Sequence, residues 1–259
     1  MSLLSRFECV VLVLLIAADY TEPNTVGAVQ PEQNSATRQI VVTSRPPEGE
    51  TQAGTLYGLT RGDFELITKV LPNLQLAVPV RQVRGEASFG DRLADLRLIG
   101  TTAQYAESHK LELSRGRFLT KKDVEQLENV AVLNEQAAGN LFGQDDPLGK
   151  SVRIGGHFFL VVGTLKSGDL REQALEEESG SEIYVPTTTM RSRLGDLHAW
   201  RRGAAFHAEH VQLSRIELTL KTADVEKSLA ILKELLQRLH EDTNYDVTTS
   251  PKLETRIKQ

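Results

Sequence analysis

The feature that most constrains the fold of this chain is a strand–helix–strand pattern that occurs twice, near the two ends of the sequence. In the first copy, residues 39–43 are β-branched, a helical period follows Thr60, and residues 74–83 are again apolar. In the second copy, residues 215–220 alternate between apolar and polar, an apolar helical stripe follows, and residues 245–248 are strand-like. Two such units can associate as a split ferredoxin-like sheet with both helices on one face.

Each expected helix of these units has a start signal and an apolar face. Thr60 and Asp63 have the spacing of a capping box, which predicts a helix over residues 61–71. Thr222 can cap the second helix, because its hydroxyl can accept a bond from a free backbone N–H. The apolar stripe of that helix consists of Val225, Leu229, Leu232, Leu236 and Leu239.

The expected strands carry their own positional signals. Pro79 cannot donate to a strand ladder, so it indicates an edge or a bulge in the strand expected over residues 74–83. Strict alternation over residues 215–220 predicts one buried and one solvated face.

Two short helices are expected in the middle of the chain. Thr120 and Asp123 repeat the capping-box spacing, and Asn134 can cap a helix that runs to Phe142.

Composition excludes several classes of protein. The 259 residues carry a formal charge of -5 with no basic stripe, which argues against a nucleic-acid partner. Cys9 is the one cysteine, so neither an internal disulfide nor a thiolate zinc cage can form.

The N-terminus contains an apolar run over residues 9–18, which is shorter than the roughly 20 residues that a spanning helix needs. We interpret it as a secretory signal or a residual membrane anchor, with a buried strand as the alternative. Residues 1–37 are therefore expected to be a signal or anchor segment followed by a polar linker.

Between the two halves lies a segment with a different character, richer in glycine and hairpin signals. Gly155-Gly156 between two apolar runs predicts a hairpin with a two-residue turn. We expect an α+β chain in which residues 86–180 form a smaller, hairpin-rich inserted lobe. Residues 38–85 and 181–250 are expected to form the discontinuous porter-like lobe, and residues 251–259 a tail.

Several motifs follow one another in order along the chain: residues 111–120, 130–134, 141–150, 152–158, 161–163 and 182–186. In this order they resemble the MacB-like periplasmic core domain of the FtsX-type ABC transporter permease family, over roughly residues 38–250. The family-motif positions have structural interpretations and imply no catalytic, cofactor-binding or metal-binding residue. They are Gly116, Arg117, Leu141, Phe142, Gly143, Pro147, Gly149, Gly163 and Pro186.

The motif around residues 141–149 makes sense as architecture. Leu141 and Phe142 can place a helix end in the core of the inserted lobe, and Gly143 can take a left-handed C-cap conformation. Pro147 fixes the following turn, and Gly149 supplies a second positive φ.

The resemblance implies a non-catalytic domain on the periplasmic face of the inner membrane, which relays ATPase-driven motion or contacts cargo and envelope partners. Its implied partners are a permease assembly with a cytoplasmic ATPase subunit, an adaptor or a chaperone, and a second copy in a full permease. The three membrane helices that follow this domain in the family are absent before Gln259. The sequence therefore leaves open a fragment and a separate envelope protein.

Two other classes of function stay open at this point. The first is a soluble envelope protein that holds an amphiphilic ligand in the cleft between the lobes. The second is an envelope hydrolase, although the sequence contains no Gly-x-Ser-x-Gly, His-Glu-x-x-His or Gly-x-Gly-x-x-Gly motif.

Three local patterns have chemical and ordinary interpretations. Residues 143–151 superficially resemble a phosphate-binding loop, but the spacing and two aspartates favour a turn before a hairpin. Arginines around Trp200 could touch lipid headgroups or an acidic partner, or simply be solvated. A weak surface metal site is weighed against a mobile polar loop for the cluster of Asp196, His198, His207, Glu209 and His210.

Overall fold

The computed structural model describes residues 37–46, 55–166, 180–202, 205–221, 225–240 and 244–250. The expected signal or anchor segment, the C-terminal tail and the helix cap at Thr222 lie outside the described residues. All of the described residues belong to one compact unit, Ala36–Gln259.

The first sheet confirms the split ferredoxin-like expectation. Its four strands are all antiparallel to their neighbours and lie in the order β12-β1-β11-β2. The two strands of each strand–helix–strand unit are thus separated by one strand of the other unit. The elements are β1 (Thr37–Ser44), α1 (Arg61–Val70), β2 (Leu74–Phe89), β11 (Arg215–Lys221), α6 (Val225–Leu239) and β12 (Tyr245–Ser250).

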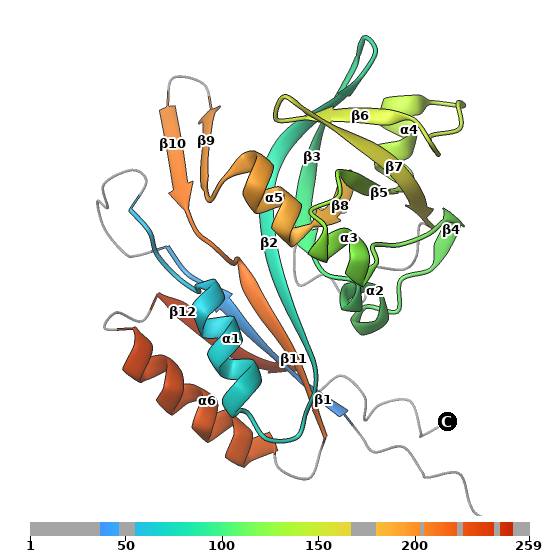
Figure 1. Ribbon diagram of the computed structural model, residues 1–259. Helices are drawn as coiled ribbons and strands as arrows, with labels where there is room; N and C mark the ends of the chain where they lie inside the picture. Colours follow the sequence, from blue (N-terminus) through green and yellow to red (C-terminus); the bar gives the residue numbers. More distant parts are fainter. Residues whose placement is uncertain are drawn as a thin grey trace, which may run out of the picture. The chain divides into compact units, whose positions relative to one another are not determined.

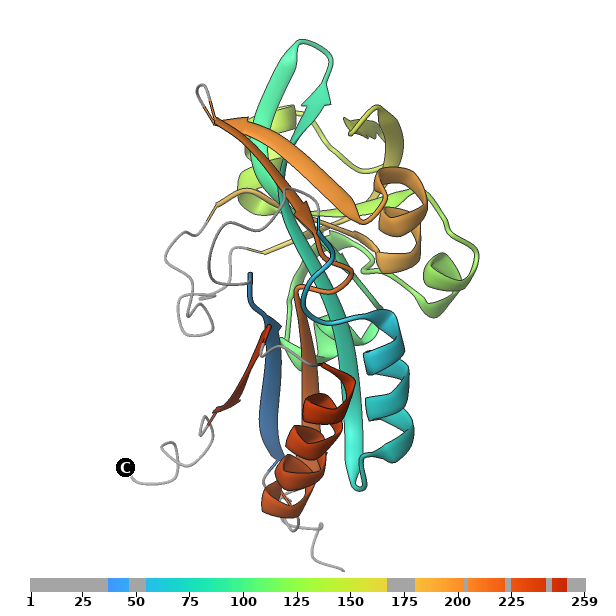
Figure 2. The ribbon, with the colours of Figure 1, turned by 90° about the vertical axis from the view of Figure 1, so that its left-hand side faces the viewer.

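Both helices of this lobe cover one face of the first sheet, as Figures 1 and 2 show. Ile40 and Leu218 from the strands pack with Ile67 of α1 and Leu232 of α6 in one apolar cluster. The capping box that starts α1 is confirmed, since the Thr60 side chain accepts from the Asp63 N–H and the Asp63 carboxylate accepts from the Thr60 N–H. These contacts explain why the apolar stripes of the sequence become helix faces.

The second sheet closes on itself through β6. Hydrogen-bonded neighbours run from β2 through β3, β8, β5, β7 and β6 and back to β2. Closure pairs the two end strands of the sheet and so reduces the strand edge left exposed, which is the usual advantage of a barrel. The new strands are β3 (Arg92–Thr101), β5 (Val130–Asn134), β6 (Ser151–Ile154), β7 (His157–Leu165) and β8 (Glu182–Pro186), and β4 (Leu113–Gly116) adds to β7.

An apolar core lies among the strands of this ring and two helices, α4 (Glu135–Phe142) and α5 (Thr187–Leu194). Leu141 and Phe142 of α4 and Met190 of α5 belong to it. The predicted cap at Asn134 is confirmed, because its side chain accepts from the Ala137 N–H at 2.8 Å. The predicted hairpin between β6 and β7 is confirmed as well, with positive φ at both of its turn glycines.

The segment that follows residue 181, which was expected to return to the porter-like lobe, packs in the core of the ring. Ile183, Val185 and Met190, from β8 and α5, pack with Ala131 and Leu133 of the ring. The chain reaches the first sheet again at β11, after a two-stranded ribbon of β9 (Leu197–Arg202) and β10 (Ala205–His210). The expectation of a polar loop over residues 196–210 is wrong, because residues 197–202 and 205–210 pair as antiparallel strands.

A third apolar cluster joins the two sheets. It combines Val78 and Val80 of β2 with Tyr105 of α2 (Gln104–Ser108), with Phe118, which precedes α3 (Lys121–Glu125), and with Tyr184 of β8. The capping box predicted for the helix after Thr120 is present at α3. Within the described ranges, none of the helices has the length and apolar character needed to cross a bilayer.

Candidate functional site: the junction of the two sheets

Strand β2 belongs to both sheets and changes partner in its middle. It pairs with β11 up to Val80 and with β3 from Arg81 onward. Pro79 therefore has a ladder partner on one side only, which explains how a proline fits inside a strand that sequence alone would end at Val83. Figure 1 shows this strand running from the helix-covered sheet into the ring. Polar side chains converge on the crossover from both lobes.

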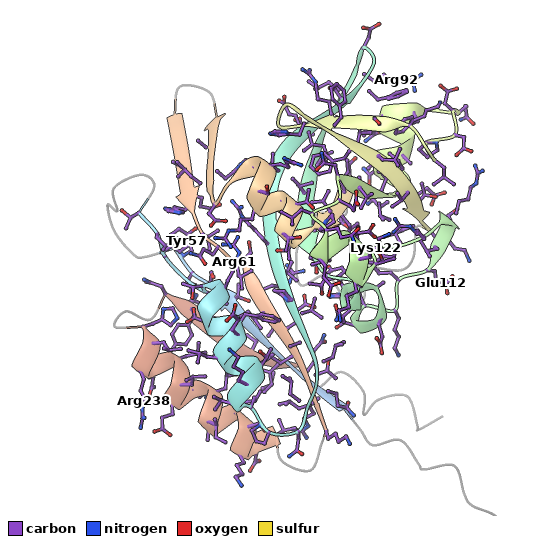
Figure 3. The ribbon with its side chains drawn as sticks, viewed as in Figure 1. Tyr57, Arg61, Arg92, Glu112, Lys122 and Arg238 are labelled. Atoms are coloured by element: carbon purple, nitrogen blue, oxygen red, sulfur yellow. The ribbon has the colours of Figure 1, made fainter. Side chains whose placement is uncertain are left out.

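The first group is the Arg81 cluster, defined as Arg61, Arg81 and Asp196. Arg81 is the first residue of β2 that pairs with β3, and its side chain is only 2% exposed. Its guanidinium donates to the carbonyl of Gly195 and, at 2.9 Å, to that of Asp196. Arg61, which opens α1 and is labelled in Figure 3, donates to both carboxylate oxygens of Asp196 at 2.8 and 2.6 Å. The cluster thereby ties α1 and β2 to the segment between α5 and β9.

Electrostatics in the Arg81 cluster favour the charged forms in mutual contact. Burial by itself would raise the pKa of Asp196, but the hydrogen bonds and charge of Arg61 and the charge of Arg81 bring that pKa below its ordinary value. Burial also lowers the pKa of Arg81, and the Asp196 carboxylate opposes this effect. A bidentate arginine–carboxylate pair fixes geometry as well as charge. The cluster is therefore a directional clamp between elements of both lobes.

The second group is the Glu217 cluster, defined as His109, Arg215 and Glu217. The Glu217 side chain is 4% exposed on the sheet face opposite the helices. Its Oε2 lies 2.6 Å from Nε2 of His109, and its Oε1 accepts from Nε of Arg215 at 2.7 Å. The His109 ring stacks on Tyr105 with centroids 4.0 Å apart, so the end of α2 covers this carboxylate.

The buried position of Glu217 corrects the expectation that alternation over residues 215–220 leaves one face solvated. Glu217 is on the predicted wet face, but α2 and its C-terminal His109 come from the inserted segment and cover it. Burial would raise the pKa of Glu217, yet the hydrogen bonds and charges of His109 and Arg215 lower it overall. The carboxylate is thus held as an anion at the contact between the two sheets.

The glycines at two family-motif positions allow β4 and β7 to approach each other closely. A Cβ on Gly163 would lie 2.1 Å from the Arg117 carbonyl oxygen, and one on Gly116 would lie 2.3 Å from that of Val162. Neither position has room for a side chain. Arg117 also donates to both carboxylate oxygens of Asp123, at 2.6 and 3.0 Å, and so braces the start of α3.

The remaining motif positions lie around α4 and the turn after it. Gly143 ends α4 with a positive φ of 64°, but its ψ of -113° is outside the left-handed helical region that the sequence predicts. Gly149 has the expected positive φ, 74°. Pro147 lies between them, and Pro186 ends β8 as the residue before α5. The phosphate-loop-like residues form this turn before the hairpin.

The histidine-containing segment forms the β9–β10 ribbon. His198 lies opposite Glu209, and His210 lies opposite Leu197. Within the described ranges, no group of three or more histidine, cysteine, aspartate or glutamate side chains could hold a metal ion. Of the arginines near Trp200, Arg191 and Arg193 are exposed on α5. The side chains of Trp200, Arg201, Arg202 and His207 lie outside what the structure describes.

Sequence reasoning missed both junction clusters, because their members come from elements far apart in the chain. One local signal was present: Arg81 comes directly after an apolar strand segment. A charged residue continuing such a strand is either solvated or paired, and pairing with Asp196 could not be read from the sequence.

A four-stranded ferredoxin-like sheet that shares a strand with a closed, helix-containing ring defines a two-lobed α+β domain. The MacB-like periplasmic core domain family matches residues 16–237. The chain belongs to this family.

Individual relatives agree with that membership. The macrolide export ATP-binding/permease protein MacB of Aggregatibacter actinomycetemcomitans is 29% identical over 213 residues, covering 81% of this chain and 30% of that protein. MacB of Syntrophobacter fumaroxidans is 26% identical over 142 residues, covering 54% and 20%. The chain thus spans less than a third of the length of these relatives.

Two solved structures share the fold. The periplasmic region of MacB from Actinobacillus actinomycetemcomitans superimposes with a TM-score of 0.62 at 22% identity, covering 81% of this chain and 87% of that one. The extracellular domain of the noncanonic ABC-type transporter YknZ from Gram-positive bacteria gives 0.61 at 22% identity, covering 81% and 99%. Membership of the family does not favour the alternative of a soluble ligand-binding protein.

Proposed function

We propose that the chain is a non-catalytic, extracytoplasmic domain of an ABC transporter permease-like assembly, and that it transmits ATPase-driven motion between membrane components and envelope partners. Family membership and the permeases among its relatives support the assembly and the location. The partners are a permease with a cytoplasmic ATPase subunit and an adaptor or chaperone.

The observation that carries the relay is the continuity of β2 through both sheets, with a polar cluster at the crossover from each lobe. A displacement of the first sheet can reach the ring through this strand, through the two polar clusters and through the apolar cluster that joins the sheets. Directional, charge-assisted bonds transmit a displacement better than apolar contacts, which slide more easily. The junction therefore couples the lobes mechanically.

The experiment has two stages. Isolation of the tagged full-length chain from envelope membranes should recover an ATPase-bearing membrane component. In the recovered assembly, Asp196→Asn should lower the amount of cargo transported per ATP hydrolysed, while the chain stays folded and bound. Asp91→Asn makes the same chemical change in the exposed turn between β2 and β3 and should leave coupling intact. Recovery of no membrane component, or unchanged coupling in Asp196→Asn, would reject the proposal.

A further inference from the structure

A groove of about 780 Å³ runs along β2 beyond the crossover. One wall is β2 itself, which contributes Arg81 and every residue from Val83 to Ser88. Gly85 in the middle of this wall has no side chain, so the wall there is backbone. The lining also includes Leu197, His198 and Ala199 of β9.

The groove lies along a gap in strand pairing. Strand β3 pairs along one edge of β2. Along the other edge, β2 pairs with β11 up to Val80 and with β6 from Ala87. Ser214 extends the first pairing by one step, since its hydroxyl accepts from the Gln82 N–H at 2.9 Å. No described strand pairs with this edge of β2 between Gln82 and Ala87, and none pairs with the edge of β9 that faces away from β10. An extended segment in the groove would therefore meet two strand edges.

The direction of the backbone groups identifies the donor that an added strand would use. Alternate residues of a strand point their N–H and C=O groups to the same side. The Gln82 N–H points to the groove edge, so the N–H of Glu86, four residues later, points there too. At Arg84, between them, the His198 ring hydrogen-bonds to the backbone. A side chain of β9 thus takes the place of a strand at Arg84.

The charge of the lining indicates the chemistry of the occupant. The whole chain is acidic, with 35 acidic against 30 basic residues. The groove departs from this balance. Arg81 is buried and paired with Asp196, so the charges that the lining offers to an occupant are Arg84 and Arg153 against one carboxylate, Glu86. Arg84 and Arg153 are exposed. Exposed Leu93 and Leu197 add apolar surface.

We propose that this groove binds an extended, acidic segment of a partner protein by strand addition to β2. Backbone hydrogen bonds between the segment and the edge of β2 at Glu86 fix the register of the segment. Arg84 and Arg153 bind its carboxylates, and its alternate apolar side chains contact Leu93 and Leu197. This interaction surface goes beyond the proposed relay, because it does not require motion at the crossover.

The test uses the full-length chain and a synthetic peptide in which glutamate and valine alternate. A lysine–valine peptide of equal length is the control peptide. Titration followed by NMR should show the acidic peptide shifting the Glu86 amide and slowing its hydrogen exchange. Glu86→Pro should weaken binding about tenfold, the factor for one lost hydrogen bond. Glu86→Ala keeps the N–H and should bind at least as well as the natural chain.

A second variant covers the case in which Glu86→Pro does not fold. Arg153→Glu should weaken binding of the acidic peptide and strengthen binding of the lysine–valine peptide. Lys227→Glu on α6 should change the affinity for neither peptide. Equal binding of Glu86→Pro and Glu86→Ala would overturn strand addition. Equal binding of both peptides to the natural chain, or binding of decyl phosphate in the groove while the acidic peptide does not bind, would overturn the acidic segment as occupant.

Discussion

Nε2 of His109 lies 2.6 Å from Oε2 of Glu217, across the contact between the inserted segment and the first sheet. The two residues are 108 positions apart in the chain. The side chain of Glu217 is nearly fully buried and that of His109 mostly buried, so bulk water screens their interaction little. Removing one partner leaves the other buried without its hydrogen bond, which is more costly than losing an exposed pair.

Glu217→Gln should therefore lower the free energy of unfolding by about 1–3 kcal/mol, because a neutral amide replaces a buried carboxylate that two basic groups contact. Urea unfolding followed by circular dichroism at neutral pH measures it. Glu226→Gln makes the same chemical change at an exposed position of α6 and should shift the midpoint little. An equal effect of the two substitutions would show that the Glu217 cluster does not stabilise the fold.

The same carboxylate makes stability depend on pH. Its pKa is lower in the folded chain than in the unfolded chain, so the unfolded state binds a proton more readily in acid. The stabilisation is present above the ordinary glutamate pKa of about 4.3 and is lost as pH falls through the lowered folded value. Unfolding free energies measured from pH 7 down to pH 3 should fall less steeply for Glu217→Gln. Parallel curves would contradict the assignment.

Packing in the ring gives a prediction that uses one substitution at two sites. Phe142→Ala should lower the unfolding free energy by about 3–5 kcal/mol, because it empties a fully buried site in the core. Phe158→Ala removes the same atoms from a side chain that is 64% exposed, and should cost far less. Thermal unfolding of both variants measures the difference, and similar melting temperatures would mean that Phe142 does not fill the ring core.

The local chemistry of the sequence accounts for many of the helix starts and turns in both lobes. The caps at Thr60 and Asn134 depend on residues three positions apart, and the turn at Gly155-Gly156 depends on adjacent residues, so these signals are readable without tertiary contacts. The repeated strand–helix–strand pattern then restricts how the halves can pair. Sequence reasoning did well where the cause was short-range.

Long-range contacts account for what sequence reasoning did not find. Glu217 alternates with apolar neighbours like any solvated strand residue, and only the arrival of α2 buries it. Closure of the ring rests on two paired positions between β2 and β6, Ala87 with Ile154 and Ser88 with Arg153. No pattern within either strand specifies that pairing. The junction therefore depends on contacts that no single stretch of the sequence contains.

The close approach of β4 and β7 gives the sharpest packing test, because one substitution has opposite expected effects at two glycines. Gly163→Ala places a methyl group 2.1 Å from the Arg117 carbonyl oxygen, a backbone atom that cannot move without separating the strands. It should destabilise the chain by about 1–3 kcal/mol or more. Gly139→Ala, within α4, meets nothing within 4 Å and should stabilise by about 0.5–1 kcal/mol, since alanine favours helix. Chemical denaturation of both variants decides it, and a neutral Gly163→Ala would show that β4 does not pack against β7 as described.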